Sequence, residues 1–378
     1  MKAPLTCWFR DEDPGPATHA LVIGVSHYPH RPLGVDDLPG AAVSADLFAR
    51  WLRGRYPGRD RRLGSIRLLL APSGDERPDV SAGPGVHLPD RATVHQALNE
   101  WAWDCMSSPD NVAVLYVCGH GVQEADDGVV VFMHDAGAVP DDVLDGALDV
   151  AGVRAGLKGD GSPARQWYFA DACRVPSADL IGLEGPAQGG ITLKRRRGSA
   201  VGHRPIFFAT TPGGESWQSR AGSVFVQALR DCLELHALVP LKNAAGGWGI
   251  TAQSLGEALD VRVRELAALD DREQAVVVGG SLTNATFLER EPPLVPVTLV
   301  VSPAEAQEVE GCGAEIFDGD TARRILERRP LPVADVPVLG GFWTLAVTFD
   351  PPCPPYIDKP AIAIQVHPPR VEQTVTLR

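Results

Sequence analysis

Two apolar segments that each end in reactive side chains constrain this chain more than any other feature. One, residues 112–117, runs into His120 between two glycines, and the other, residues 167–170, runs into Asp171 and Cys173. Continuous apolar runs of this length are typical of strands buried on both faces of a parallel sheet. We therefore expect two neighbouring parallel strands whose carboxyl ends share one edge, where open α/β folds build their sites.

A thiol and an imidazole at one sheet edge can act as nucleophile and base. A cysteine attacks as its thiolate, and a pKa near ~8.5 leaves it largely protonated at neutral pH. A neighbouring histidine can accept the thiol proton and later protonate the leaving amine, while the N–H groups of Gly121 and Cys173 could stabilise the oxyanion. We interpret His120 and Cys173 as this pair; the alternative is a buried structural thiol and a hydrogen-bonded histidine at a strand end. Cys118 we expect in the core.

The chain up to residue 290 alternates between strand and helix patterns. Further strands are expected at residues 19–26, 65–70, 129–133, 205–210 and 274–278, and helices at 41–52, 94–105 (capped by Asp90 or Thr93), 149–157, 223–236 and 255–269. This alternation indicates βαβ units and a mainly parallel sheet. Residues 1–18 are expected to be an irregular lead-in, and residues 175–204 a long loop. We place one large α/β domain at 19–290.

The pattern changes at Glu291, which two prolines follow. Residues 291–378 contain four strand-like segments, at 297–301, 343–349, 361–366 and 371–377, with prolines between them, and one helix candidate at 320–328. We expect a small β-sandwich-like accessory domain. It could recognise a partner, sense a trigger or brace the large domain.

Charge and cysteine usage exclude several classes of function. The formal charge of −13 argues against nucleic acid or an anionic membrane as the main partner. The seven cysteines form no CxxC pair and no zinc-ligand spacing with histidine, which favours reduced thiols and no metal centre. No segment has signal-peptide character or approaches the ~20 apolar residues of a membrane span. We expect a cytoplasmic protein that needs no cofactor.

Three blocks of the chain resemble the caspase-fold cysteine peptidases, which include caspases, paracaspases, metacaspases and their bacterial relatives. Residues 116–121 (YVCGHG) are similar to the family's strand ending in Ser-Gly-His-Gly, and residues 171–174 (DACR) to its Asp-x-Cys motif. Residues 215–218 (ESWQ) with 222–225 (GSVF) resemble the Ser-Trp-Arg segment and the Gly-Ser-x-Phe that opens the next helix. The resemblance covers about 19–280, and a bacterial-type metacaspase-like protease fits it. It implies a caspase-like sandwich, His120 as base, Cys173 as nucleophile, and Gly121 with Cys173 as oxyanion donors.

Charge also predicts which side chain the S1 pocket would accept. Caspases that cut after aspartate carry arginines and a glutamine in this pocket, whereas this chain has Asp171 two residues before the cysteine. Gln218 stands where caspases have the arginine of Ser-Trp-Arg, and Leu38 and Gly40 stand where the first helix could supply another. Glu215 matches an acidic pocket position of paracaspases. Because a buried charge needs a partner, we expect Arg or Lys at P1, with Arg better suited to bidentate pairing.

The remaining pocket residues follow from the same resemblance. Ser44 stands where metacaspases have an aspartate, which leaves two pocket acids in place of three. Ser216 would pair with the extended substrate backbone and Trp217 would form the S2 wall. The alternatives are that Asp171 only makes local hydrogen bonds and that Trp217 is a core residue.

A basic run in the expected 175–204 loop is a candidate for self-processing. Relatives are commonly cut in this linker, and an acidic pocket would accept its residues, which are Lys194, Arg195, Arg196 and Arg197. The alternatives are a solvated charge run or a docking patch for an acidic partner. Some metacaspases require Ca²⁺, and the turn containing Glu124, Asp126 and Asp127 could bind it, but a solvated turn is favoured because the loop lacks a fixed ligand spacing.

The sequence thus predicts an activation-controlled cysteine endopeptidase that cleaves proteins after Arg or Lys. Two alternatives stay open. One is a caspase-like scaffold that acts by binding, and the other is a peptidase that cleaves after Asp.

Overall fold

The chain divides into two compact units. The computed structural model describes residues 3–13, 15–56, 62–74, 76–79, 83–124, 128–139, 141–142, 144–174, 190–194, 202–242, 247–280 and 285–377. The first unit comprises Met1–Cys232 with Thr251–Leu288, and the second comprises Leu233–Ile250 with Glu289–Arg378. Our sequence analysis assigned Leu233–Ile250 to the large domain. This segment instead groups with the C-terminal residues, where the ring of Trp248 packs against the backbone of Gly340.

The first unit is built on one large sheet with the strand order β1-β3-β2-β5-β9-β10-β15 and β4 paired to β3. The pairs from β4 through β10 are parallel, whereas β1 and β15 pair antiparallel at the two ends. This confirms the predicted mainly parallel sheet. Its strands are β1 (Phe9–Arg10), β2 (Ala17–Val25), β3 (Arg62–Ala71), β4 (Val86–His87), β5 (Val112–Cys118), β9 (Arg165–Asp171), β10 (Ile206–Phe208) and β15 (Val277–Gly279).

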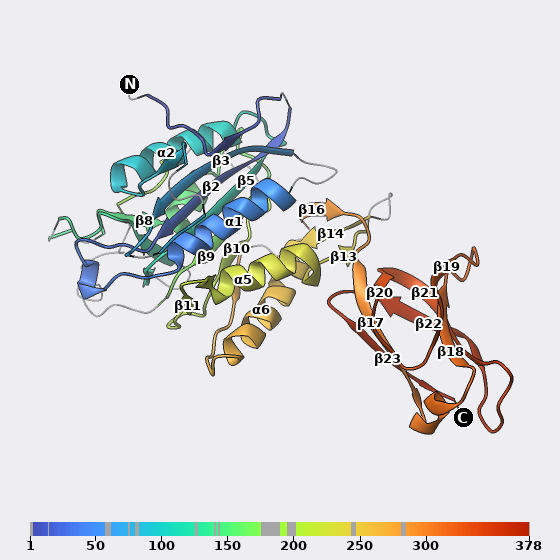
Figure 1. The fold of residues 1–378 in the computed structure, drawn as a ribbon. Coiled ribbons are helices and arrows are strands. Elements are labelled where there is room, and N and C mark those ends of the chain that lie inside the picture. Colours follow the sequence, from blue (N-terminus) through green and yellow to red (C-terminus); the bar gives the residue numbers. More distant parts are fainter. Residues whose placement is uncertain are drawn as a thin grey trace. The chain divides into compact units, whose positions relative to one another are not determined.

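Helices cover both faces of this sheet, with α1 on one face and α2 on the other (Figure 1). On β5, Leu115 joins the buried cluster of α2, while the next residue, Tyr116, stacks on Phe48 of α1 with ring centroids 4.8 Å apart. Both faces are therefore apolar, which explains the continuous hydrophobic runs. The helices are η1 (Pro32–Gly34), α1 (Ala41–Arg55), α2 (Arg91–Cys105), α3 (Val150–Gly156), α5 (Val224–Asp231), the π-helical turn η2 (Cys232–His236) and α6 (Ala252–Ala268).

Other short strands form small separate sheets. Those that follow β5 form an antiparallel sheet in the order β6-β7-β8. Strands β11 and β12 form a hairpin, and β13 pairs with β14. Their bounds are β6 (Gly121–Glu124), β7 (Gly128–Phe132), β8 (Ala147–Asp149), β11 (Gln218–Ser219), β12 (Gly222–Ser223), β13 (Val239–Pro240), β14 (Trp248–Thr251) and β16 (Thr286–Arg290).

The expected irregular lead-in at residues 1–18 contains a strand and the start of another. Strand β1 pairs with β3, and β2 begins at Ala17. Next to this pairing, Arg62 Nη1 lies 2.7 Å from the Asp11 carboxylate. None of the helices in the described part of the chain has the length and apolar composition that crossing a bilayer requires.

The second unit contains the two sheets of the predicted β-sandwich, in the orders β20-β17-β23 and β19-β18-β21-β22. Both sheets contribute side chains to one buried cluster. The helix candidate at 320–328 is wrong, because these residues form a turn and the start of β19. Only Leu326 is fully buried in this strand, its neighbour Ile325 is partly buried, and the charged residues on either side are exposed, so its sequence lacks the alternation of a strand. The elements are β17 (Leu294–Ser302), η3 (Ala304–Glu308), β18 (Cys312–Phe317), β19 (Arg324–Pro330), β20 (Val333–Leu339), β21 (Gly341–Phe349), β22 (Lys359–Val366) and β23 (Val371–Thr376).

Candidate active site

The register of β5 and β9 brings the predicted nucleophile and base to the same edge of the sheet. Cys118 lies opposite Asp171, so His120 and Cys173 each follow this matched pair by two residues. The segments stay in contact beyond the strands, because a Cβ atom on Gly121 would lie 2.8 Å from the carbonyl oxygen of Cys173. A glycine is therefore required at position 121 for the two segments to approach this closely.

Two hydrogen bonds orient His120. Its Nε2 lies 2.9 Å from the carbonyl oxygen of Asp36, and a carbonyl can only accept, so Nε2 carries the proton. In the neutral ring Nδ1 then has the free lone pair. The His120 main-chain N–H donates to the Tyr28 hydroxyl at 2.8 Å, and that hydroxyl donates to the carbonyl oxygen of Val25 at 3.0 Å.

The electrostatic surroundings keep the imidazole neutral. Burial lowers the pKa of His120 below its usual value, and the hydrogen bond to the Asp36 carbonyl and the charges of Asp37 and Asp36 oppose this shift only in part. At neutral pH the ring is therefore an acceptor of protons, not an imidazolium.

Cys173 is a partly buried thiol held by the segment that precedes β11. The main-chain N–H of Ser216 donates to its Sγ at 3.3 Å. Burial raises the pKa of Cys173, the Ser216 hydrogen bond opposes this, and the negative charges of Glu215 and Asp171 raise the pKa further. The thiol is therefore protonated at neutral pH, so it needs a base before it can attack.

Asp171 is 2% exposed and lies among hydroxyl groups. It accepts hydrogen bonds from Tyr116 Oη at 2.6 Å, from Ser216 Oγ at 3.2 Å and from Ser223 Oγ. Burial raises the pKa of Asp171, and the hydrogen bonds from Ser223, Tyr116, Cys118 and Ser216 oppose that effect. These donors in the described residues are all neutral, so the carboxylate has hydrogen bonds but no cation beside it.

The start of α1 and the β11–β12 hairpin meet beside this carboxylate. A Cβ atom on Gly40, whose φ is +110°, would lie 2.1 Å from the carbonyl oxygen of Ser219. The amide oxygen of Gln218 lies 4.0 Å from Cys118 Sγ, so the residue at the caspase arginine position points toward the same buried region. Gly40 and Gln218, the two positions at which this chain lacks a caspase arginine, therefore both lie close to the β11–β12 hairpin.

Ser44 lies in this neighbourhood, but its hydroxyl group serves the main chain. It donates to the Gly40 carbonyl oxygen at 2.7 Å and accepts from the Ser223 N–H at 2.8 Å. The residue is fully buried. Its two main-chain bonds join α1 to β12, so it supports the wall of the site and does not present a free hydroxyl to a ligand.

Trp217 is partly buried and lies at the surface next to Ser216. Its main-chain N–H donates to Gln274 Oε1 at 3.0 Å, its ring N–H donates to the Glu273 carbonyl oxygen at 3.3 Å, and Arg272 lies over the ring with Cζ 4.0 Å from the centroid. Glu215, one residue before Ser216, is exposed. A cavity of about 460 Å³ lies beside the Trp217 ring, between the hairpin and the end of α6.

Sequence reasoning missed four supporting residues. The sequence analysis considered Tyr116 only as part of the block 116–121 and Ser223 only as part of the block that opens a helix, yet both donate hydrogen bonds to Asp171. Tyr28, which binds the His120 main-chain N–H, follows the end of β2. Because β2 pairs with β5, this position could have suggested that Tyr28 lies near His120. Gln274, which holds Trp217, carries no local signal because the contact depends on the tertiary fold.

Two of the expectations fall largely outside the described residues. In the basic run only Lys194 is described, and it is exposed, whereas Arg195, Arg196 and Arg197 lie outside the described residues. In the candidate Ca²⁺ turn Asp126 and Asp127 lie outside them as well. Within the part of the chain that is described, no three His, Cys, Asp or Glu side chains gather as a metal site would require.

The caspase-domain model of the C14 peptidases matches residues 17–264, about two thirds of the chain. The chain is 26% identical over 300 residues to an uncharacterised protein, y4kE, of Sinorhizobium fredii, which covers 76% of this chain and 83% of that one.

The solved structures that match this chain are more distant in sequence. Protein GSU0716 from Geobacter sulfurreducens is 15% identical, with 73% of this chain and 98% of that chain covered and a TM-score of 0.43. Caspase-1 from Spodoptera frugiperda is 12% identical, with 75% and 96% covered and a TM-score of 0.39. The family match over residues 17–264 confirms the resemblance inferred from the three sequence blocks. The chain belongs to the caspase-domain family, whose members are cysteine peptidases and their caspase-fold relatives.

Proposed function

We propose that this protein is a cysteine endopeptidase that cleaves proteins after Arg or Lys, with Cys173 as nucleophile and His120 as general base. The observation that carries the proposal is the matched placement of both residues two positions beyond the Cys118–Asp171 pair. The hydrogen bond from His120 Nε2 to the Asp36 carbonyl supports it, because Nδ1 is then the nitrogen left to accept the thiol proton.

The reaction would proceed through a thioester. Nδ1 of His120 takes the proton from Cys173 Sγ as the sulfur attacks the scissile carbonyl carbon, and the main-chain N–H groups of Gly121 and Cys173 bind the resulting oxyanion. The C–N bond breaks as the imidazolium returns its proton to the amine. A water molecule, deprotonated by His120, then attacks the thioester and releases the carboxylic acid and the thiol.

The preference for Arg or Lys rests on the negative charge beside the thiol. Asp171 is buried with neutral donors, so a guanidinium or ammonium group would supply the cation that it lacks. Glu215 would face the same side chain from the solvent side. An aspartate at P1 would add a further carboxylate to this group, which like-charge repulsion disfavours.

We further propose that Ser216 pairs with the substrate backbone, that Trp217 forms the S2 wall, and that the enzyme processes itself after one of residues 194–197. Intact-mass analysis of active protein tests the last point, because a cut in this run would give two fragments of defined mass. Absence of any such cut in fully active enzyme would refute it.

The burial of Asp171 favours one other candidate, a scaffold that binds partners with its pocket closed. A panel of peptides with Arg, Lys or Asp at P1, tested with the natural protein and with Cys173→Ala, separates the possibilities. We expect turnover of the Arg and Lys peptides that Cys173→Ala abolishes and that neither EDTA nor added Ca²⁺ alters. The scaffold predicts no turnover of any peptide, and an Asp-specific enzyme predicts the opposite preference.

A further inference from the structure

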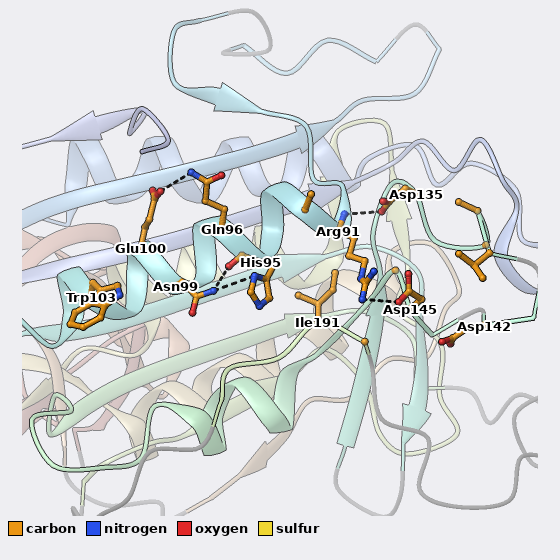
Figure 2. Close-up of a pocket in the computed structure, with 16 residues that line it drawn as sticks. Arg91, His95, Gln96, Asn99, Glu100, Trp103, Asp135, Asp142, Asp145 and Ile191 are labelled. Atoms are coloured by element: carbon orange, nitrogen blue, oxygen red, sulfur yellow. Dashed lines mark hydrogen bonds and ion pairs between the residues drawn. The ribbon is translucent and has the colours of Figure 1, made fainter. Parts of the chain in front are cut away.

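A groove of about 970 Å³ runs along α2, outside the site described above (Figure 2). One wall is a stripe on the exposed side of α2, where residues recur every fourth position. The opposite wall is formed by residues that follow β7 and by Gly190 with Ile191; those after β7 are Asp135, Gly137, Ala138, Val139, Asp142, Asp145 and Gly146. The stripe consists of Arg91, His95, Asn99 and Trp103.

The walls of this groove carry a strong excess of negative charge. Four acids and one arginine line the groove, so with His95 counted as neutral the lining has a formal charge of 1 − 4 = −3. Arg67, which lies behind the lining with Nε 3.5 Å from Glu100 Oε2, offsets one of these acids. Arg91 is engaged with Asp145, at 2.9 Å between Nη2 and Oδ1. Asp142 is exposed, and within the described residues its carboxylate makes no hydrogen bond or ion pair. The four acids are Glu100, Asp135, Asp142 and Asp145.

Large apolar side chains accompany these acids. Trp103 is 65% exposed and Val139 on the opposite wall is 47% exposed, whereas Trp101, two residues earlier on α2, is fully buried. An exposed tryptophan beside carboxylates is suited to a cation, because its ring face attracts a guanidinium or ammonium group. Exposed aromatic residues are also enriched at protein interfaces.

The other flank of α2 already binds extended backbone. The Leu5 N–H donates to both carboxylate oxygens of Glu100 at 3.2 Å, and Gln96 Nε2 donates to the Ala3 carbonyl oxygen at 2.8 Å. Glu100 and Gln96 also line the groove. The polar side chains of α2 are therefore able to hold a peptide strand.

The groove begins near the proposed catalytic edge. Asp135, which accepts from the Arg91 N–H at 2.9 Å, follows Phe132 by three residues, and the Phe132 N–H donates to the His120 carbonyl oxygen at 2.9 Å. From Arg91 to Trp103 the helix rises about 18 Å, which matches about six residues of extended chain.

We propose that this groove binds an Arg- or Lys-rich segment of a partner protein, with the cationic side chains contacting Trp103 and Asp142. The charge of the groove selects a basic segment, and its length and exposed tryptophan fit a peptide of about six residues. Binding here is separate from cleavage and does not depend on the proposed peptidase activity.

The test measures binding to the full chain carrying Cys173→Ala, so that no peptide is consumed. The probe is a fluorescein-labelled octapeptide of alternating Arg and Gly, and the matched control peptide has Gln in place of Arg. Fluorescence anisotropy should show tight binding only of the Arg peptide. Trp103→Ala and Asp142→Asn should each weaken it about threefold and together about tenfold, as expected for exposed cation–π and ion-pair contacts.

Asp160→Asn is the control for general attraction to an acidic protein, since Asp160 is an exposed acid outside the groove. It should leave the affinity unchanged, and thermal melting checks that every variant is folded. Equal binding of the Gln peptide, or unchanged affinity in the double groove variant, would overturn the proposal. A third result would also overturn it: spermine binding depends on Trp103 and Asp142 while peptide binding does not. The groove would then be a polyamine site.

Discussion

Replacing Asp171 with asparagine should separate recognition of a basic P1 side chain from the reactivity of Cys173. Asparagine has the same shape and keeps Oδ1 as an acceptor for Ser216 Oγ. The hydroxyls of Tyr116 and Ser223 can accept as well as donate, so they can rotate to bind the new amide. We therefore expect the free energy of unfolding to change by no more than about 1 kcal/mol.

The effect on cleavage should be much larger, because Asp171 is 2% exposed. Removing one partner of a buried, hydrogen-bonded charge pair costs about 2–5 kcal/mol. At about 1.4 kcal/mol for each tenfold, kcat/KM for a peptide with Arg at P1 should fall by about 30-fold or more. Glu215 is exposed, and an exposed ion pair contributes about 1 kcal/mol at most, so Glu215→Gln should cost about fivefold or less.

Two assays separate binding of the P1 side chain from chemistry at the thiol. The first compares kcat/KM for peptides with Arg and with citrulline at P1, which differ in charge and hardly in shape. The natural enzyme should prefer Arg strongly, and Asp171→Asn should lose most of that preference. The second is the rate at which iodoacetamide alkylates Cys173. Because the charge of Asp171 raises the pKa of Cys173, the variant should react as fast or faster.

Either of two results would refute this reasoning. If Asp171→Asn retains the preference for Arg over citrulline, the buried carboxylate does not recognise P1. If alkylation slows together with cleavage, Asp171 supports the reactivity of the thiol, and the claim that its charge acts on P1 while raising the pKa of Cys173 is wrong.

Three further changes test other parts of the site and fold. Gly121→Ala should abolish cleavage, because its methyl group would lie 2.8 Å from the Cys173 carbonyl oxygen; full activity of a folded variant would contradict the proposed oxyanion site. His19 has its pKa lowered from 6.5 to about 4 by burial, so its contribution to stability is complete above pH 6.5 and falls as the pH drops toward 4. Urea unfolding should therefore show a loss of about 1.5 kcal/mol between pH 6.5 and 5, and His19→Gln should remove that loss. Agmatine, a small alkylguanidine, should speed alkylation of Cys173 about threefold, equivalent to about half a pKa unit; no acceleration would mean that no cation binds beside the thiol.

The ends of β5 and β9 could be located from sequence because the signal is local. A strand buried on both faces must be continuously apolar, so the first polar residues after it mark its exit. His120 and Cys173 stand at such exits, and parallel pairing then makes them neighbours. The edge strand β19 gives the opposite case, since it buries only Leu326 and its pattern was mistaken for a helix.

The supporting contacts could not be predicted in the same way, because they join segments far apart in the chain. Ser44 was expected to face the substrate from its alignment with a metacaspase aspartate, yet its hydroxyl bridges Gly40 and Ser223. Gln274 reaches Trp217 across 57 residues of sequence. No periodicity or motif encodes such a pairing, which exists only once the sheet and helices have packed.

The charges around Cys173 connect the proposed specificity with the state of the thiol. Burial holds the sulfur in its protonated form, and the same two acids that would bind a basic P1 side chain, Asp171 and Glu215, raise its pKa further. A bound guanidinium would offset these charges and lower the cost of forming the thiolate. Since the His120 ring is neutral, it can take the proton at that moment. A substrate with Arg at P1 would thus bind more tightly and also ease ionisation of the nucleophile, whereas a substrate with Asp would oppose both.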